Sequence, residues 1–147
     1  MEALLAAELP HGEDWQYEPK WDGFRCIARR DGDAIEMISR SGKPLGRYFP
    51  EVLEMLGQVK ERRFALDGEL IIPVDDRLDF EALQMRLHPA ESRVRKLSKE
   101  TPALLMLFDV LEIAGKSFDE LPLAARREAL EHFYKKNAVD GLLLSPA

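Results

Sequence analysis

One short stretch combines residue types that can form and stabilise a covalent bond to phosphorus. Residues 18–25 read Glu-Pro-Lys-Trp-Asp-Gly-Phe-Arg. A free lysine is almost entirely protonated at neutral pH, so Lys20 would need nearby cations such as Arg25, or a bound metal ion, to act as a nucleophile. Asp22 would stabilise the ammonium form, so its useful roles are to orient the lysine or to hold a divalent metal. Gly23 would let the backbone approach a phosphate closely.

The same stretch also fits a simpler interpretation, a surface turn with Lys20 pointing into water. That interpretation suits most K-x-D-G strings, and it holds only if no other part of the sequence agrees with the chemical one. Three other stretches do agree. They are residues 39–42 (Ser-Arg-Ser-Gly), 66–70 (Leu-Asp-Gly-Glu-Leu) and 107–111 (Leu-Phe-Asp-Val-Leu).

In order and spacing, the four stretches resemble the motifs of the ATP-dependent DNA ligases and of their relatives, the RNA ligases and mRNA capping enzymes. They look like K-x-D-G, S-R-x-G, D-G-E, and an aromatic residue plus aspartate on a buried strand. Residues 17–25 and 84–89 (Gln-Met-Arg-Leu-His-Pro) are most similar to bacterial ATP-dependent ligases of the end-joining repair type. The sequence is therefore identified as a member of this ligase family.

The resemblance implies roles for individual residues. Lys20 would attack the α-phosphorus of ATP, release pyrophosphate and carry AMP as a phosphoramidate. Glu18 would help to recognise the adenine, and Phe108 would stack on its ring, although a phenylalanine on an apolar strand is by default a core residue. Arg25 and Arg40 would contact the ribose, the phosphates or the nicked strand, since arginine is always charged and fits phosphate oxygens.

A metal ion is implied by the chemistry as well as by the family. Displacement of pyrophosphate builds negative charge on the triphosphate, which a divalent ion stabilises, so Mg²⁺ is the expected cofactor beside ATP. The resemblance places Glu69 near the ribose and the metal, with Asp22 as an orienting or metal-proximal residue. Simpler alternatives are a turn carboxylate at Glu69 and an Arg40 that pairs with Glu36 along a strand.

The elements that must position these residues are of mixed type. Strands are predicted at residues 15–20, 24–30, 34–40, 64–73, 104–113 and 140–144, and helices after Pro50, after a capping Asp79 and after Pro122. This order favours an α+β fold over a doubly wound parallel sheet. The resemblance implies the ATP-grasp-like nucleotidyltransferase fold of DNA ligases and mRNA capping enzymes, with mostly antiparallel sheets and flanking helices.

The family pattern continues with E-G-h-h-h-K and K-x-K motifs and an OB-fold domain that clamps DNA, none of which follows here in recognisable form. Residues 140–145 are interpreted as the strand that precedes the first of these. The resemblance thus implies that residues 1–147 are a partial adenylation domain, incomplete at the C-terminus and with no OB-fold domain. A sheet edge would be left uncovered, which favours self-association.

Composition excludes other classes. The 147 residues, 46% hydrophobic and 33% charged, are enough for one domain with a core. A single cysteine, Cys26, excludes a disulfide framework and most cysteine-ligated metal sites. No apolar run approaches the roughly 18 residues of a transmembrane helix. No membrane association and a cytoplasmic, nucleoid-associated location are therefore expected.

The expected partners follow from the family. The net charge of −6 argues mildly against a polyanion, but basic residues gather at residues 20–47 and 85–99. The resemblance implies nicked double-stranded DNA as the substrate, with the end-binding protein Ku and a repair polymerase as partners by analogy. Two alternatives stay open: a catalytically incomplete ligase-like module that binds nucleotide or a partner, and an RNA ligase or capping-type nucleotidyltransferase.

Overall fold

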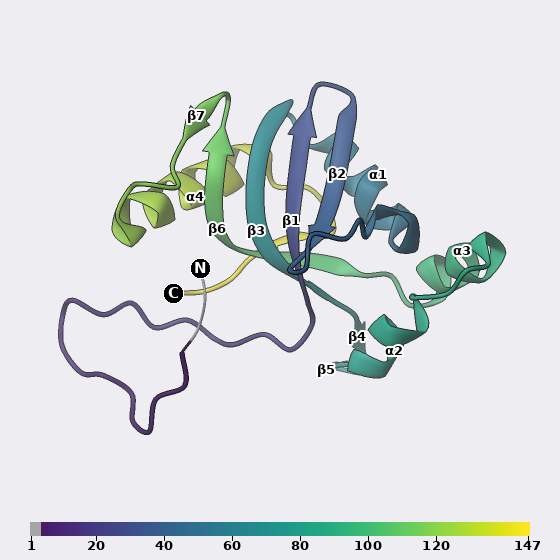
Figure 1. Cartoon of the computed structure of the whole chain (residues 1–147), viewed down its shortest axis with the longest axis horizontal. Helices are drawn as coiled ribbons and strands as arrows, with labels where there is room; N and C mark the ends of the chain where they lie inside the picture. Colours follow the sequence, from purple (N-terminus) through teal and green to yellow (C-terminus); the bar gives the residue numbers. More distant parts are fainter. Residues whose placement is uncertain (1–3) are drawn as a thin grey trace.

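The computed structural model describes residues 4–147, and a curved sheet forms its centre (Figure 1). Its main strands lie in the order β2 (Ala34–Ser39), β1 (Phe24–Asp31), β3 (Arg63–Ile71), β6 (Leu104–Ile113) and β7 (Lys116–Ser117), with every neighbouring pair antiparallel. One more strand, β8 (Leu142–Leu144), pairs with β6 in the parallel direction. The predicted α+β fold with a mostly antiparallel sheet is confirmed.

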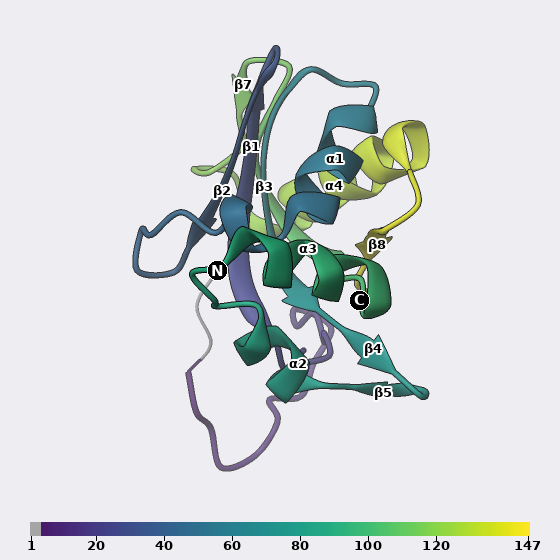
Figure 2. The ribbon, with the colours of Figure 1, turned by 90° about the vertical axis from the view of Figure 1, so that its right-hand side faces the viewer.

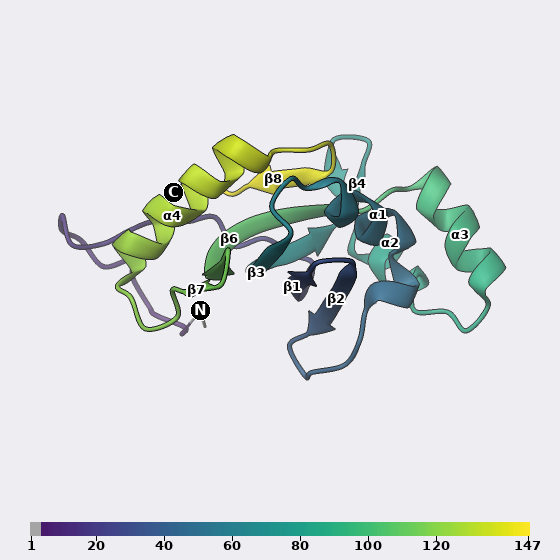
Figure 3. The same ribbon diagram turned by 90° about the horizontal axis from the view of Figure 1, so that it is seen from above.

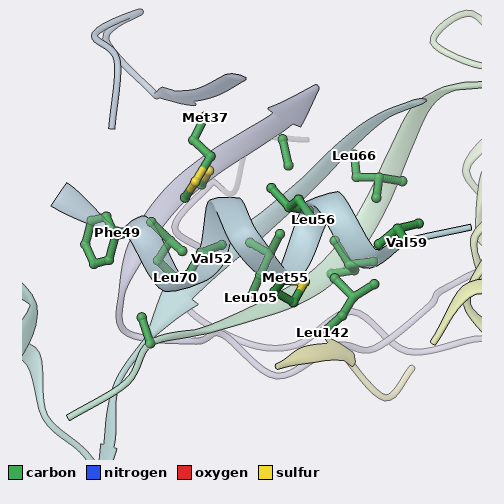
Figure 4. Close-up of a cluster of buried hydrophobic side chains, with 14 of the residues drawn as sticks. Met37, Phe49, Val52, Met55, Leu56, Val59, Leu66, Leu70, Leu105 and Leu142 are labelled. Carbon is green, nitrogen blue, oxygen red and sulfur yellow. The ribbon is translucent and has the colours of Figure 1, made fainter. Parts of the chain in front are cut away.

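Two helices, α1 (Pro50–Gln58) and α4 (Leu123–Asn137), cover one face of this sheet (Figure 2). A proline begins α1 without cost, because the first N–H of a helix has no intrahelical acceptor. The buried side chains of α1 pack against apolar residues of the strands beneath, as Figure 4 shows. These helix residues are Val52, Met55 and Leu56. The helix predicted after Pro50 is therefore present.

A group of smaller elements, among them β4 (Pro73–Val74), α2 (Phe80–Met85) and α3 (Glu91–Glu100), lies to one side of the sheet in Figure 3. Two other short elements are the 3₁₀ helix η1 (Gly46–Tyr48) and β5 (Arg77–Leu78), which forms a hairpin with β4. Asp79 caps α2 as predicted, since its carboxylate accepts the backbone N–H of Ala82 at 3.0 Å. Neither α3 nor the β4–β5 hairpin was predicted.

A fully buried arginine connects these smaller elements to α1. The guanidinium of Arg86 donates to the carboxylate of Glu51 at the start of α1. It also donates to the backbone carbonyls of Tyr48 at 3.1 Å, Leu97 at 3.4 Å and Thr101 at 2.7 Å. Because a buried charge must be paired and hydrogen-bonded, this cluster fixes how α3 and η1 sit against α1.

The strand predicted at residues 15–20 is not formed; residues 15–22 are irregular. Trp15 and Tyr17 keep 55% and 47% of their surfaces exposed, so no apolar face is buried there to hold a strand in place. Pro19 has no N–H to donate to a neighbouring strand. The other predicted strands and helices are present with modestly shifted ends. Over residues 4–147, no helix combines the length and apolar character that crossing a membrane requires.

Burial also controls the chemistry of the single cysteine. Cys26 lies on β1 with none of its surface exposed, and burial raises the pKa of its thiol to about 12. Since the thiolate is the reactive form, we predict that iodoacetamide at pH 8 leaves Cys26 of the native chain unmodified and alkylates it after unfolding in guanidinium. Intact-mass measurement checks this, and rapid labelling of the native chain would contradict the buried position.

Candidate active site

An open cleft with a volume of about 1360 Å³ crosses the sheet face that the helices leave uncovered. Side chains alternate along a strand, so Arg25 faces this cleft while its neighbour Cys26 packs in the core. All six residues expected to bind ATP line the cleft: Glu18, Lys20, Arg25, Arg40, Glu69 and Phe108. Asp22 does not line it but lies beside Lys20. The structure thus gathers these residues from segments far apart in the sequence.

Lys20 extends from the irregular segment that leads into β1. Its Nζ lies 3.6 Å from Oδ1 of Asp22, and the two side chains are 82% and 81% exposed. Ion pairs as exposed as this contribute little stability, because water and salt screen them. The lysine side chain is therefore not held by Asp22 and can turn toward a nucleotide in the cleft.

Gly23 determines how this segment joins the sheet. A Cβ atom at position 23 would lie 2.0 Å from the carbonyl oxygen of Leu70 and 3.0 Å from Cγ of Glu69. Any other residue would push the segment away from β3. The close approach that this glycine permits is thus to the backbone of β3, whereas the sequence suggested an approach to phosphate.

A buried ion pair lies under the cleft. Nε and Nη2 of Arg25 donate to the two carboxylate oxygens of Asp67, at 3.2 and 2.7 Å, and Asp67 has only 3% of its side chain exposed. The guanidinium carbon of Arg25 lies 5.5 Å from the centre of the Phe108 ring. A bidentate pair fixes the plane of the guanidinium, so Arg25 forms a rigid part of the cleft floor.

Phe108 reaches the cleft through an irregularity in the sheet. On β3, Gly68 pairs with Leu107 and Asp67 pairs with Asp109, so Phe108 has no partner opposite it. Such a β-bulge redirects a side chain. The residue opposite the bulge must lack a side chain, as Gly68 does, because a Cβ at position 68 would lie 2.6 Å from the carbonyl oxygen of Met106. Phe108 therefore lies half-buried at the cleft. The apolar character of its strand alone would have favoured a position in the core.

Asp109, which the sequence left without a role, is buried and holds α4 to the sheet. Its Oδ1 accepts Nε of Arg126 at 2.9 Å and the backbone N–H of Val110 at 2.9 Å. Arg126 also donates to the carbonyl oxygen of Leu121 at 2.6 Å. These contacts make Asp109 a structural residue of this part of the fold.

Basic residues dominate the polar lining of the cleft. Three of them are exposed: Arg40 and Lys43 in the connection between β2 and η1, and Arg47 in η1 itself. Arg47 is held in place, since it donates to the carbonyl oxygen of Pro89 at 3.1 Å and its guanidinium lies 4.9 Å from the centre of the Tyr48 ring. The cleft therefore carries a local positive field suited to a polyphosphate, although the whole chain is acidic.

Glu69 supplies a carboxylate to the cleft floor. Burial raises its pKa above the ordinary value, while the backbone N–H of Gly23 and the charge of Arg25 act in the opposite direction. Within residues 4–147, no group of three or more His, Cys, Asp or Glu is placed to hold a metal ion. Because Mg²⁺ commonly binds one or two carboxylates plus substrate phosphates, Glu69 fits an ion that is shared with a nucleotide.

Comparison with known proteins identifies the family. Residues 4–141 match the model of the ATP dependent DNA ligase domain. The chain belongs to the ATP-dependent DNA ligase family. This ligase domain is 50% identical over 117 residues to DNA ligase C of Mycobacterium tuberculosis, which covers 80% of the chain and 33% of that protein. It is 32% identical over 137 residues to the bifunctional non-homologous end joining protein LigD of Bacillus subtilis, covering 88% of the chain and 22% of that protein.

Solved structures show the same fold. The ligase domain from M. tuberculosis LigD superposes with a TM-score of 0.63 at 23% identity, covering 88% of this ligase domain and 38% of that chain. A mycobacterial DNA ligase D complexed with ATP and MES gives a TM-score of 0.62 with the same coverage. The predicted nucleotidyltransferase fold is confirmed. The chain spans about a third of the length of the curated DNA ligase C relatives that it matches.

The raised pKa of Glu69 predicts how stability depends on pH. A carboxyl whose pKa is higher in the folded chain opposes folding increasingly as the pH rises above the ordinary carboxyl pKa. Glu69→Gln should therefore raise the free energy of unfolding at pH 8, by less than about 1 kcal/mol because the half-exposed group is screened. Urea unfolding at pH 8 and pH 4 measures this, and the gain should shrink at pH 4.

An exposed carboxylate provides the control. Glu128 on α4 is exposed, so Glu128→Gln should produce no comparable gain at either pH. A Glu69→Gln variant that is less stable than the parent at pH 8 would contradict the prediction.

Proposed function

We propose that this chain supplies the nucleotide-binding part of the adenylation domain of an ATP-dependent DNA ligase, with Lys20 as the residue that becomes covalently linked to AMP. The observation that carries the proposal is the cleft itself. It places an exposed, loosely held lysine beside a rigid arginine, a half-buried carboxylate and an aromatic ring freed by a bulge. Family membership supports the reaction, and this geometry supports the assignment of residues.

Different parts of the cleft suit the adenine and the phosphates of ATP. The flat ring of Phe108 offers a stacking surface for the adenine, and Glu18 offers a hydrogen-bond acceptor for its amino group. Arg25 and Arg40 are fixed charges that bind ribose or phosphate oxygens. A magnesium ion held by Glu69 and the phosphates, with Asp22 nearby, would neutralise charge on the leaving pyrophosphate.

The covalent step exchanges one bond for another. The unprotonated Nζ of Lys20 attacks the α-phosphorus, a P–N bond forms, and the P–O bond to the β-phosphate breaks. Pyrophosphate leaves with the bonding electron pair, and the nitrogen releases a proton to solvent. The cationic side chains that line the cleft, Arg25 and Arg40 among them, favour the negative charge that develops on the leaving pyrophosphate. The product is lysyl-AMP, a phosphoramidate.

The later steps are inferred for the ligase as a whole. A 5′-phosphate oxygen of nicked double-stranded DNA displaces Lys20 from the AMP, and the neighbouring 3′-hydroxyl then displaces AMP and seals the strand. The similarity to proteins named for non-homologous end joining supports a role in DNA repair, with Ku and a repair polymerase as partners. The cytoplasm, at the nucleoid, is where such a substrate is found.

Intact-protein mass spectrometry tests the covalent step. Incubation with ATP and Mg²⁺ should add one AMP to the parent chain and none to Lys20→Ala, because only the ε-amine can form the phosphoramidate. Lys60→Ala, which removes an exposed lysine outside the cleft, should keep the adduct. An adduct on Lys20→Ala would overturn the assignment.

Two further outcomes identify the alternatives. A folded parent without an adduct would make this chain a nucleotide- or partner-binding module. A GMP adduct formed from GTP, or transfer to nicked RNA in preference to DNA, would favour a capping-type enzyme or an RNA ligase.

We further propose that self-association of the isolated chain through β8 is weak. Within residues 4–147, β8 pairs with β6 alone. Its outer edge is partly occupied, because the Leu142 carbonyl accepts the Tyr134 hydroxyl at 3.0 Å and the Leu142 N–H donates to Val139 at 3.1 Å. Light scattering should give the 16.8 kDa monomer at about 10 µM and a rising mass toward about 1 mM. A constant mass over this range would contradict the proposal.

A further inference from the structure

A hydrogen bond between distant parts of the chain holds the segment that carries Lys20. The indole Nε1–H of Trp21 donates to the hydroxyl oxygen of Ser145 at 2.8 Å. Ser145 has no exposed surface. Its backbone N–H donates to the carbonyl oxygen of Leu107 at 2.8 Å, and its hydroxyl lies 3.4 Å from the carbonyl oxygen of Pro146. Ser145 is thus anchored to the sheet and presents its hydroxyl oxygen to the indole.

This bond matters because the segment has few other anchors. Residues 15–22 form no strand or helix, so no ladder of backbone hydrogen bonds fixes them. The contact between Lys20 and Asp22 is too exposed to hold the lysine in one position. Gly23 is pressed against β3, but it lies three residues beyond the lysine. Trp21 is therefore the nearest firm attachment of the backbone at Lys20.

The attachment point is next to the proposed adenine-binding residue. Ser145 continues β8 along β6 and is bonded to Leu107, which directly precedes Phe108. Trp21 itself lines the cleft. The Trp21–Ser145 bond thus sets how far the lysine segment lies from the strand that carries Phe108. A ligand bound against Phe108 would be presented to Lys20 at a distance that this bond controls.

We propose that Trp21 and Ser145 are positioning residues for the attack of Lys20 on the α-phosphorus; this rests on the proposed function. In-line attack needs the nitrogen within about 3–3.5 Å of the phosphorus, and a misplacement of about 1 Å lowers a rate by orders of magnitude. Their loss slows the covalent step while leaving nucleotide affinity in place, since neither residue supplies the charges or the stacking ring that bind ATP.

Two variants remove the bond from opposite sides. Trp21→Phe keeps an aromatic ring but removes the N–H, and Ser145→Ala removes the acceptor with a minimal change in volume. In single-turnover experiments with saturating ATP and Mg²⁺, each should form lysyl-AMP about tenfold more slowly than the parent, with the Kd for ATP changed by less than about twofold. The double variant should be no slower than the slower single variant, because both changes remove the same bond.

Tyr134→Phe is the matched control. It removes another side-chain hydrogen bond to β8, from the Tyr134 hydroxyl to the Leu142 carbonyl oxygen at 3.0 Å, away from the cleft. Thermal unfolding of all variants shows how much stability each has lost. At a temperature where every variant is folded, Tyr134→Phe should react at the parental rate even if its Tm falls as far as that of Ser145→Ala.

The outcomes separate the two proposals. If the parent forms lysyl-AMP and both Trp21→Phe and Ser145→Ala form it as fast as the parent does, the positioning role alone is overturned. A loss of rate in Tyr134→Phe equal to that in Ser145→Ala would overturn it as well, because the effect would then reflect general loosening of β8. A folded parent that forms no adduct would overturn the proposed function and this inference with it.

Discussion

The buried pair of Arg25 and Asp67 is the interaction on which the cleft depends. A carboxylate with 3% of its side chain exposed requires a charged partner, and removing either member of such a pair typically costs about 3–5 kcal/mol. A second carboxylate also needs a cation, because Asp109 lies opposite Asp67 on the neighbouring strand β6. Two facing carboxylates repel unless each has its own cation. Arg25 serves the first and Arg126 the second, so one ion pair shapes the cleft and the other attaches α4.

Much of this architecture follows from local sequence signals. Proline at the start of α1, an aspartate cap before α2 and the apolar run of β6 each have a direct physical meaning, and each predicted element formed. The cleft residues were predicted from the resemblance of short motifs to a family, because a lysine, an aspartate and a glycine in sequence are also found in ordinary turns. In the structure, residues from 18 to 108 converge at one cleft, which favours the chemical interpretation.

The features that the sequence did not reveal depend on tertiary contacts. The direction of Phe108 is set by a bulge opposite Gly68, which no periodicity in either strand indicates. The burial of Arg86 needs acceptors from three elements, η1, α1 and α3 with its C-terminal end. The expected strand at residues 15–20 failed for the opposite reason, because aromatic content favours a strand only when a neighbouring surface covers it. Trp21 and Ser145 were not singled out, since nothing local connects them.

The separation of Trp21 from Ser145, 124 residues along the chain, also bears on how the molecule folds. Contacts between residues so distant in sequence close large loops, and they generally form late and slow folding. Strands β1 and β2 make a local hairpin that can assemble early, whereas the loop ahead of them finds its anchor only after β8 has docked on β6. On a chain emerging from the ribosome, the segment that carries Lys20 would therefore be made before β8 but secured only after it.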